Sequence, residues 1–128
     1  MREVRRLKAE IFQALGHPTR LAILELLQGG ELTVGEILSR LEMAQSNVSQ
    51  HLTILRGRRL VVTRRDGNRV YYSLRDPILG QVMALMRRYT VSHLSEDMTL
   101  LREMGVGRRV AARSARRGAR RARAWHRV

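Results

Sequence analysis

The sequence predicts a mainly α-helical fold with one small β-hairpin, and three patterns support that prediction. Apolar residues recur at helical spacing in five stretches between residues 4 and 101. Two runs rich in β-branched, aromatic and basic residues, 60–65 and 69–74, have the composition of paired strands. Asp66-Gly67-Asn68 lies between them and favours a tight turn, because Gly67 and Asn68 tolerate positive φ. Five helices with a two-stranded hairpin, or wing, after the fourth make a winged helix-turn-helix.

Local signals mark where the helices begin. Pro18 suits the first turn of the second helix. Thr33 and Glu36 match a capping box at the start of the third. Asp76 can cap the fifth, with Pro77 in its first position. About three residues join the third and fourth helices, which makes them the helix-turn-helix pair. The expected helices are 2–15, 19–28, 34–41, 45–57 and a long one from 77.

The fourth helix has one apolar face, and its remaining surface is polar. Val48, Leu52 and Leu55 follow the spacing i, i+4, i+7 and therefore share one side. The other sides carry short donors and acceptors and an arginine, which are the side chains that read base edges and contact phosphates in a major groove. The residues predicted to bind DNA on this helix are Gln45, Ser46, Asn47, Ser49, Gln50, Thr53 and Arg56.

The hairpin and its surroundings are strongly basic. Residues 46–75 contain seven arginines and one acid, a net charge of +6. An anionic partner usually offsets such self-repulsion, whereas the alternative is a surface whose charges are only solvated. We therefore expect double-stranded DNA as the partner. Arg64, Arg65 and Arg69 of the wing are predicted to contact phosphates or a minor groove.

Composition argues against several other functions. The 128 residues contain no cysteine, so no disulfide or thiolate metal site can form. The apolar run near the N-terminus is too short for a signal peptide or a membrane span, so we expect a cytoplasmic protein without a membrane partner. No phosphate-binding glycine loop and no pair of carboxylates with a histidine at helical or turn spacing is present. The chain is therefore expected to be no enzyme and to need no cofactor.

Charge also divides the chain into two parts. Residues 1–104 carry a net charge of +5 and are expected to form one winged-helix domain for DNA binding and dimerisation. Residues 105–128 carry nine arginines and no acid, in an Ala/Arg-rich segment without an apolar face. We expect this tail to be disordered alone and to lie along phosphates, and the alternative is a solvated extension without a role. It supports an alternative function, an architectural protein that coats DNA with little sequence preference.

Three segments follow one another in a recognisable order and spacing: ALGHPTRLAILELL (14–27), SNVSQHLTILR (46–56) and LVVTRRDGNRVYYSL (60–74). Together they resemble the ArsR/SmtB family of bacterial winged-helix transcription regulators, over about residues 4–102. The resemblance implies a homodimer with paired terminal helices that binds an operator of two-fold symmetry. It also implies a protein that is most often a repressor and that an effector releases from DNA.

The long fifth helix has a wide apolar stripe at the edge of a small domain. Helix 1 of the same chain can cover part of that stripe, and we expect a second subunit to cover the rest. The residues predicted to form this dimer interface are Leu7, Ile11, Leu79, Val82, Met86 and Tyr89.

Two positions depart from the family pattern. The family often caps the recognition helix with serine or a similar residue, but Ala44 stands here, so capping is expected to be weaker or to fall to Gln45 or Ser46. An Ala-Gly pair commonly precedes the first wing strand, where this chain has Arg58-Arg59. We expect Gly57 to move the end of the helix back by about two residues.

Many family members sense metals, but this chain offers few ligands. The family's thiolate site falls at 31–36, which contains no cysteine. A second site joins Asp and His at the start of the fifth helix to a later His-x-x-Glu/His. Gly80 and Val82 stand where the first half belongs, so we expect no metal site. The residual candidates are His93, Glu96 and Asp97.

Two further histidines are expected to be structural. His17 lies in the turn between the first two helices. His51 lies about 60° from the apolar centre of its helix, which suits a half-buried packing or hydrogen-bonding role, with a phosphate contact as the alternative.

Overall fold

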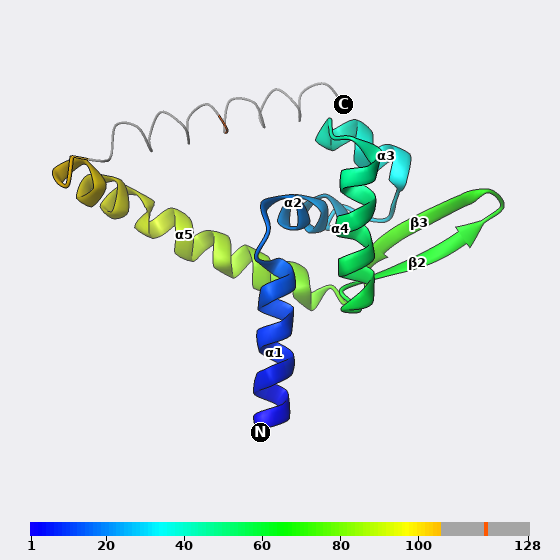
Figure 1. Ribbon diagram of the computed structural model, residues 1–128, viewed down its shortest axis with the longest axis horizontal. Coiled ribbons are helices and arrows are strands. Elements are labelled where there is room, and N and C mark those ends of the chain that lie inside the picture. The colour runs from blue at the N-terminus through cyan, green and yellow to red at the C-terminus, as the bar shows by residue number, and fades with distance from the viewer. Residues whose placement is uncertain (106–116, 118–128) are drawn as a thin grey trace. The chain divides into compact units, whose positions relative to one another are not determined.

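The chain divides into two units, residues 1–80 and 81–128, and the computed structural model describes residues 1–105 and 117. The five helices and the hairpin expected from the sequence are confirmed (Figure 1). The expectations for the tail, 105–128, fall outside the described residues except at Gly105 and Arg117. The elements of the first unit are α1 (Arg2–Leu15), α2 (Pro18–Leu27), β1 (Leu32–Thr33), α3 (Val34–Leu41), α4 (Gln45–Gly57), β2 (Val61–Asp66) and β3 (Arg69–Leu74). The long helix α5 (Ile78–Glu103) starts at the end of this unit and continues into the second.

The core of the first unit lies between α2, α3, α4 and the sheet. These helices bury apolar side chains that the sequence places at helical spacing, because only one face of each is apolar. Ile23 and Leu24 of α2, Ile37 of α3, and Val48 and Leu55 of α4 each have 0% of their surface exposed. This packing fixes α4 by its inner side and leaves the other sides free.

Side chains cap the starts of α2, α3 and α5, and the caps of α3 and α5 are those expected from the sequence. Thr33 and Glu36 form a complete capping box, with the Glu36 N–H donating to Thr33 Oγ1 at 3.2 Å. Asp76 accepts at Oδ1 from the N–H of Ile78 at 2.9 Å, at the start of α5. At α2 the cap is His17, whose Nδ1 accepts from the N–H of Thr19 at 3.1 Å. The structural role expected for His17 is therefore confirmed.

The sheet has three strands rather than the two expected. Its order is β1-β3-β2, with both pairings antiparallel. In the added pairing Leu32 lies opposite Tyr72, and Thr33 lies opposite Tyr71. Two residues are too few to show a strand period, and β1 exists because β3 runs beside it. The added strand ties the wing to the segment that leads into α3.

The wing turns through a two-residue loop, since Asp66 pairs with Arg69. Of the two loop residues, Gly67 has a φ of +60°, whereas Asn68 is not among the described residues with positive φ. The turn expected at Asp66-Gly67-Asn68 is confirmed, and positive φ is used at Gly67 alone of the two residues that tolerate it. A hairpin loop with glycine alone in this conformation, at its first position, matches a type II′ turn, whose twist suits that of the flanking strands.

The end of α4 also differs from the expectation. The helix runs through Gly57, and the left-handed residue is Arg59, with a φ of +58°. The N–H of Leu60 donates to the Leu55 carbonyl at 3.0 Å, and that of Arg59 to the Arg56 carbonyl at 2.9 Å. These two bonds define a Schellman motif, in which glycine is the usual left-handed residue. Gly57 therefore does not move the helix end, because the motif closes two residues later.

Candidate nucleic-acid interface

The recognition helix candidate, α4, presents polar side chains on its free sides. All seven residues predicted to bind DNA on this helix are exposed, whereas Leu52 on the inner side is 2% exposed. Ala44 precedes the helix without a side-chain cap bond, as the sequence predicted. Thr53 donates its hydroxyl to the carbonyl of Ser49 at 2.9 Å, so its methyl group and lone pairs remain for a ligand.

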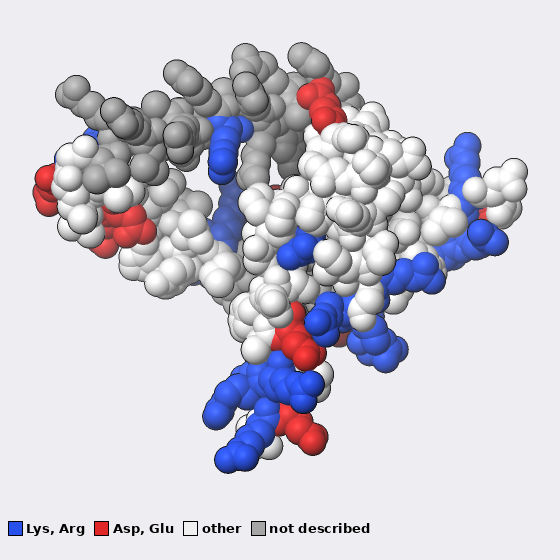
Figure 2. All heavy atoms as spheres, in the orientation of Figure 1, with Lys and Arg blue, Asp and Glu red and all other residues white. Residues whose placement is uncertain are grey.

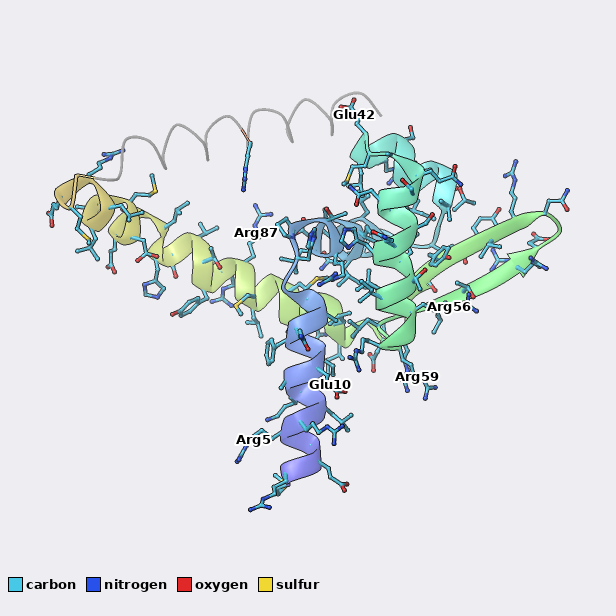
Figure 3. The ribbon with its side chains drawn as sticks, in the orientation of Figure 1. Arg5, Glu10, Glu42, Arg56, Arg59 and Arg87 are labelled. Atoms are coloured by element: carbon cyan, nitrogen blue, oxygen red, sulfur yellow. The ribbon has the colours of Figure 1, made fainter. Side chains whose placement is uncertain are left out.

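Arginines continue this surface from the lower end of α4 onto the wing. Figure 2 shows Lys and Arg side chains gathered over these elements, and Figure 3 marks Arg56 and Arg59 at the end of α4. Arg58 is paired instead, with its Nη1 3.2 Å from Oε2 of Glu10 in α1. A helix that can enter a groove thus stands beside cationic arms that can reach its phosphates.

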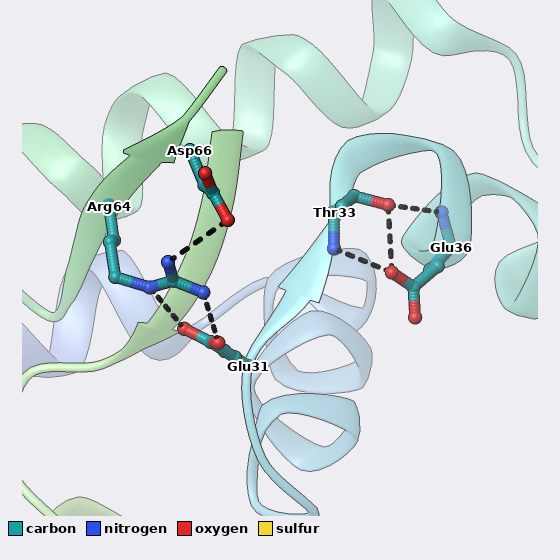
Figure 4. Close-up of polar contacts among 5 residues, drawn as sticks. All are labelled: Glu31, Thr33, Glu36, Arg64 and Asp66. Atoms are coloured by element: carbon teal, nitrogen blue, oxygen red, sulfur yellow. Dashed lines mark hydrogen bonds and ion pairs between the residues drawn. The ribbon is translucent and has the colours of Figure 1, made fainter. Parts of the chain in front are cut away.

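The three wing arginines predicted to contact DNA have different surroundings. Arg64 donates to both carboxylate oxygens of Glu31, with Nε 3.1 Å from Oε2 (Figure 4). Its guanidinium also lies 4.5 Å from the centre of the Tyr71 ring. Its Nη1 is also 4.0 Å from Oδ2 of Asp66. Within the described part of the chain, neither Arg65 nor Arg69 takes part in an ion pair, and both are exposed.

The ion pair between Glu31 and Arg64 also shifts the pKa of each group. The hydrogen bond from Arg64 lowers the pKa of the Glu31 carboxyl, and the same bond raises the pKa of Arg64. Both side chains remain accessible to water, so the pair adds little to stability. The pair holds the Arg64 guanidinium of the wing against the segment that leads into β1.

The inner side of α4 carries one polar side chain, His51, which is 8% exposed. Its ring centroid lies 4.2 Å from that of His17, and its Nδ1 is 3.3 Å from Nη1 of Arg20 in α2. The hydrogen-bonding role expected for His51 is thus confirmed, although the side chain is buried rather than half-buried. Burial, followed by the charges of His17 and Arg20, lowers the pKa of His51.

Apolar side chains are exposed on α1 and α5. Leu7 is 58% exposed and Ile11 36%, while Val82, Met86 and Tyr89 are 42%, 53% and 66% exposed. Leu79 is partly buried. Each helix therefore has an apolar face that water covers in a single chain, and these faces include the residues predicted for the dimer interface.

The residual metal candidates make one contact with each other. His93 Nδ1 lies 3.7 Å from Oε2 of Glu96, and the His93 ring lies against that of Tyr89, with centroids 4.9 Å apart and planes tilted by 53°. Among residues 1–105 and 117, no group of three or more His, Cys, Asp or Glu side chains could hold a metal ion. In the same residues, no helix is both long and apolar enough to cross a membrane.

A helix-turn-helix with a polar outer face and a basic wing defines the class of winged-helix DNA-binding proteins. Residues 17–63 match the arsR family of bacterial regulatory proteins. The HTH-type transcriptional regulator Rv0081 of Mycobacterium tuberculosis is 40% identical over 103 residues, which are 80% of this chain and 90% of that protein. Its crystal structure gives a TM-score of 0.67 at 41% identity, over 73% of this chain and 95% of the solved chain.

Two further relatives add to the comparison. The homodimeric winged helix-turn-helix DNA-binding domain of Mb0332 from Mycobacterium bovis gives a TM-score of 0.67 at 31% identity, over 73% of this chain and 87% of the solved chain. Transcriptional repressor SdpR of Bacillus subtilis is 38% identical over 69 residues, which are 54% of this chain and 77% of that protein. The chain belongs to the ArsR family, whose members are DNA-binding transcription regulators and not enzymes.

Proposed function

We propose that this chain is a dimeric repressor that binds a palindromic operator in double-stranded DNA and leaves it when an effector binds. The observation that carries the proposal is the environment of α4. Val48 and Leu55 anchor its inner side at 0% exposure, while every predicted base-reading side chain on it is exposed. A rigidly held helix with a polar outer surface suits sequence readout in a major groove.

Side chains near the start of α4 are assigned to base edges. Ser46, Asn47 and Ser49 are short donors and acceptors, and Gln50 suits adenine, to which its amide can bond twice. Thr53 has its hydroxyl proton engaged with Ser49, so we assign it an apolar contact such as a thymine methyl group. Gln45 and Arg56, at the two ends, are assigned to the phosphate backbone.

In the wing, the direct contacts are assigned chiefly to Arg65 and Arg69. These arginines are exposed and have no ion-pair partner within the described residues. Arg64 already has Glu31 and Tyr71 as partners, and a phosphate has to compete with both. We therefore infer that Arg64 mainly holds the wing in place, with the smallest share of the contacts among the three.

A second copy of the chain is the proposed cover of the apolar faces of α1 and α5. The side chains involved are large, and Tyr89 is 66% exposed in the single chain. The related domain of Mb0332 is homodimeric, which supports the same assembly here. A two-fold axis would present two copies of α4 to half-sites about one helical turn apart.

The test is the ratio of two affinities, one for a palindrome from the protein's own promoter and one for random DNA of the same length. A sequence-specific regulator should prefer the palindrome by about a thousandfold or more at physiological salt. A ratio near one would contradict the proposal and favour the architectural alternative.

The tail bears on that alternative, because residues 105–128 carry nine arginines and no acid. We expect deletion of 105–128 to weaken operator and random DNA by a similar factor, since cationic arms bind phosphates without reading bases. Quantitative footprinting at about 50 mM and 200 mM salt measures this. Loss of the preference, rather than of general affinity, would mean that the tail reads sequence.

A further inference from the structure

One arginine joins three helices of the first unit. Arg20, in the first turns of α2, donates from Nε to the carbonyl of Ala14 and from Nη2 to the carbonyl of Gln13 at 3.4 Å. Both carbonyls belong to the last turn of α1, where the regular bonds to residues four positions on have ended, and the Gln13 carbonyl also accepts from the N–H of Gly16 at 3.2 Å. The third nitrogen, Nη1, faces Nδ1 of His51 in α4 at 3.3 Å.

The geometry also determines the protonation of His51. A guanidinium has donors but no acceptor, so Nδ1 of His51 must accept, and the ring proton is on Nε2. His51 is 8% exposed, and its ring lies against that of His17, which in turn caps α2. A protonated His51 would turn a second donor and a second positive charge toward Arg20.

We propose that Arg20 and His51 form a joint that holds the recognition helix α4 to the end of α1, and that protonation of His51 opens this joint and weakens operator binding. The inference rests on the proposed function, in which α4 reads the operator. Arg20 and His51 are positioning residues, because Arg20 lies in α2, His51 lies on the inner side of α4, and neither is assigned a contact with DNA.

The surrounding charges favour the neutral histidine. His17 and Arg20 act on His51 as like charges. The acid of α1 nearest in sequence to this joint, Glu10, is engaged elsewhere, 3.2 Å from Arg58 and 3.6 Å from Arg6. A histidine with a lowered pKa stabilises the fold while it is neutral. That contribution is complete above its ordinary pKa of about 6.5 and is lost as the pH falls below it.

The expected change in operator affinity on acidification is opposite in sign to that of a simple charge effect. Protonating histidines adds positive charge, and added charge strengthens binding to phosphates. The joint predicts weaker operator binding in acid, because a recognition helix displaced by about 1 Å no longer meets the bases correctly. The two effects can be separated by removing the titration of His51 alone.

The experiment measures the operator affinity of the full chain at about pH 7.5 and about pH 5.5, for wild type and His51→Gln. A glutamine oxygen can still accept from Arg20 but does not titrate in this range. We expect wild type to lose at least about threefold more affinity on acidification than His51→Gln. His93→Gln, at a histidine 49% exposed on α5, should keep the wild-type profile.

Equal pH dependence in wild type and His51→Gln would overturn the inference. Arg20→Lys keeps the positive charge but loses the planar guanidinium that bonds to both α1 and α4. This variant decides the question if His51→Gln fails to fold. It should lower operator affinity at about pH 7.5 at least threefold, with random-DNA affinity unchanged. Unchanged operator affinity in Arg20→Lys would also overturn the joint. Absence of operator preference in wild type at either pH would instead refute the proposed function.

Discussion

The apolar stripes of α4 and α5 have the same helical spacing but opposite surroundings. In α4, Val48 and Leu55 are 0% exposed, whereas in α5 Val82 and Met86 are 42% and 53% exposed. Spacing predicts that a face will be covered, and it does not say by what. For α4 the cover is the core of its own chain. For α5 we propose a second copy, so the same pattern supports folding in one helix and assembly in the other.

The largest expected effect comes from making the same change, valine to aspartate, in each of the two helices. Val48→Asp places an unpaired charge in the core and should cost about 3–5 kcal/mol, a large part of a total stability of about 5–15 kcal/mol. Val82→Asp should keep the fold and produce monomers that bind operator poorly. Circular dichroism during thermal unfolding and sedimentation velocity at micromolar concentration distinguish the two outcomes.

Gln81→Asp is the matched control, an exposed position beside the stripe, and it should remain a dimer. A stable wild-type monomer at micromolar concentration would remove the assembly role of α5. A fully folded, dimeric Val48→Asp would contradict the burial of the α4 stripe.

A second, smaller contrast lies within the wing. Arg69→Ala should weaken binding to every DNA sequence and reduce the slope of log affinity against log salt by about 0.9, the effect of one lost phosphate contact. Arg64→Ala should leave that slope nearly unchanged, because Glu31 already neutralises its charge. Titrations over a range of salt concentrations supply both slopes. Equal reductions in the two variants would place Arg64 on a phosphate too.

The smallest effect concerns the junction between α4 and the wing. Arg59 has a φ of +58°, a conformation that costs a side chain about 1 kcal/mol and costs glycine nothing. Arg59→Gly should therefore stabilise the fold by about 0.5–1 kcal/mol, as measured by urea unfolding. Arg56→Gly, inside the helix, is the control and should destabilise it by a similar amount. A less stable Arg59→Gly would show that the arginine makes a contact worth more than its strain.

The features that were predictable from the sequence are the local ones. Helix limits, the capping box of Thr33 and Glu36, and the exposure of the polar surface of α4 follow from spacing within a few residues. The strand β1 and the ion pair between Glu31 and Arg64 could not be predicted from spacing, because Glu31 and Arg64 are 33 residues apart in the chain. Likewise 31 residues separate Arg20 from His51. No periodic pattern specifies which distant residues meet, so these contacts became visible only in the folded chain.

The central claim is that the outer face of α4 reads bases, and Gln50→Ala tests it most directly. Fluorescence anisotropy at physiological salt gives the affinities of wild type and variant for operator and for random DNA. The account predicts that the variant loses about 1–3 kcal/mol, roughly 5- to 150-fold, on the operator and almost nothing on random DNA. Gln81→Ala, a matched change on α5, should alter neither affinity. Equal losses of Gln50→Ala on both DNAs would show that this side chain touches only the backbone and would contradict the claim.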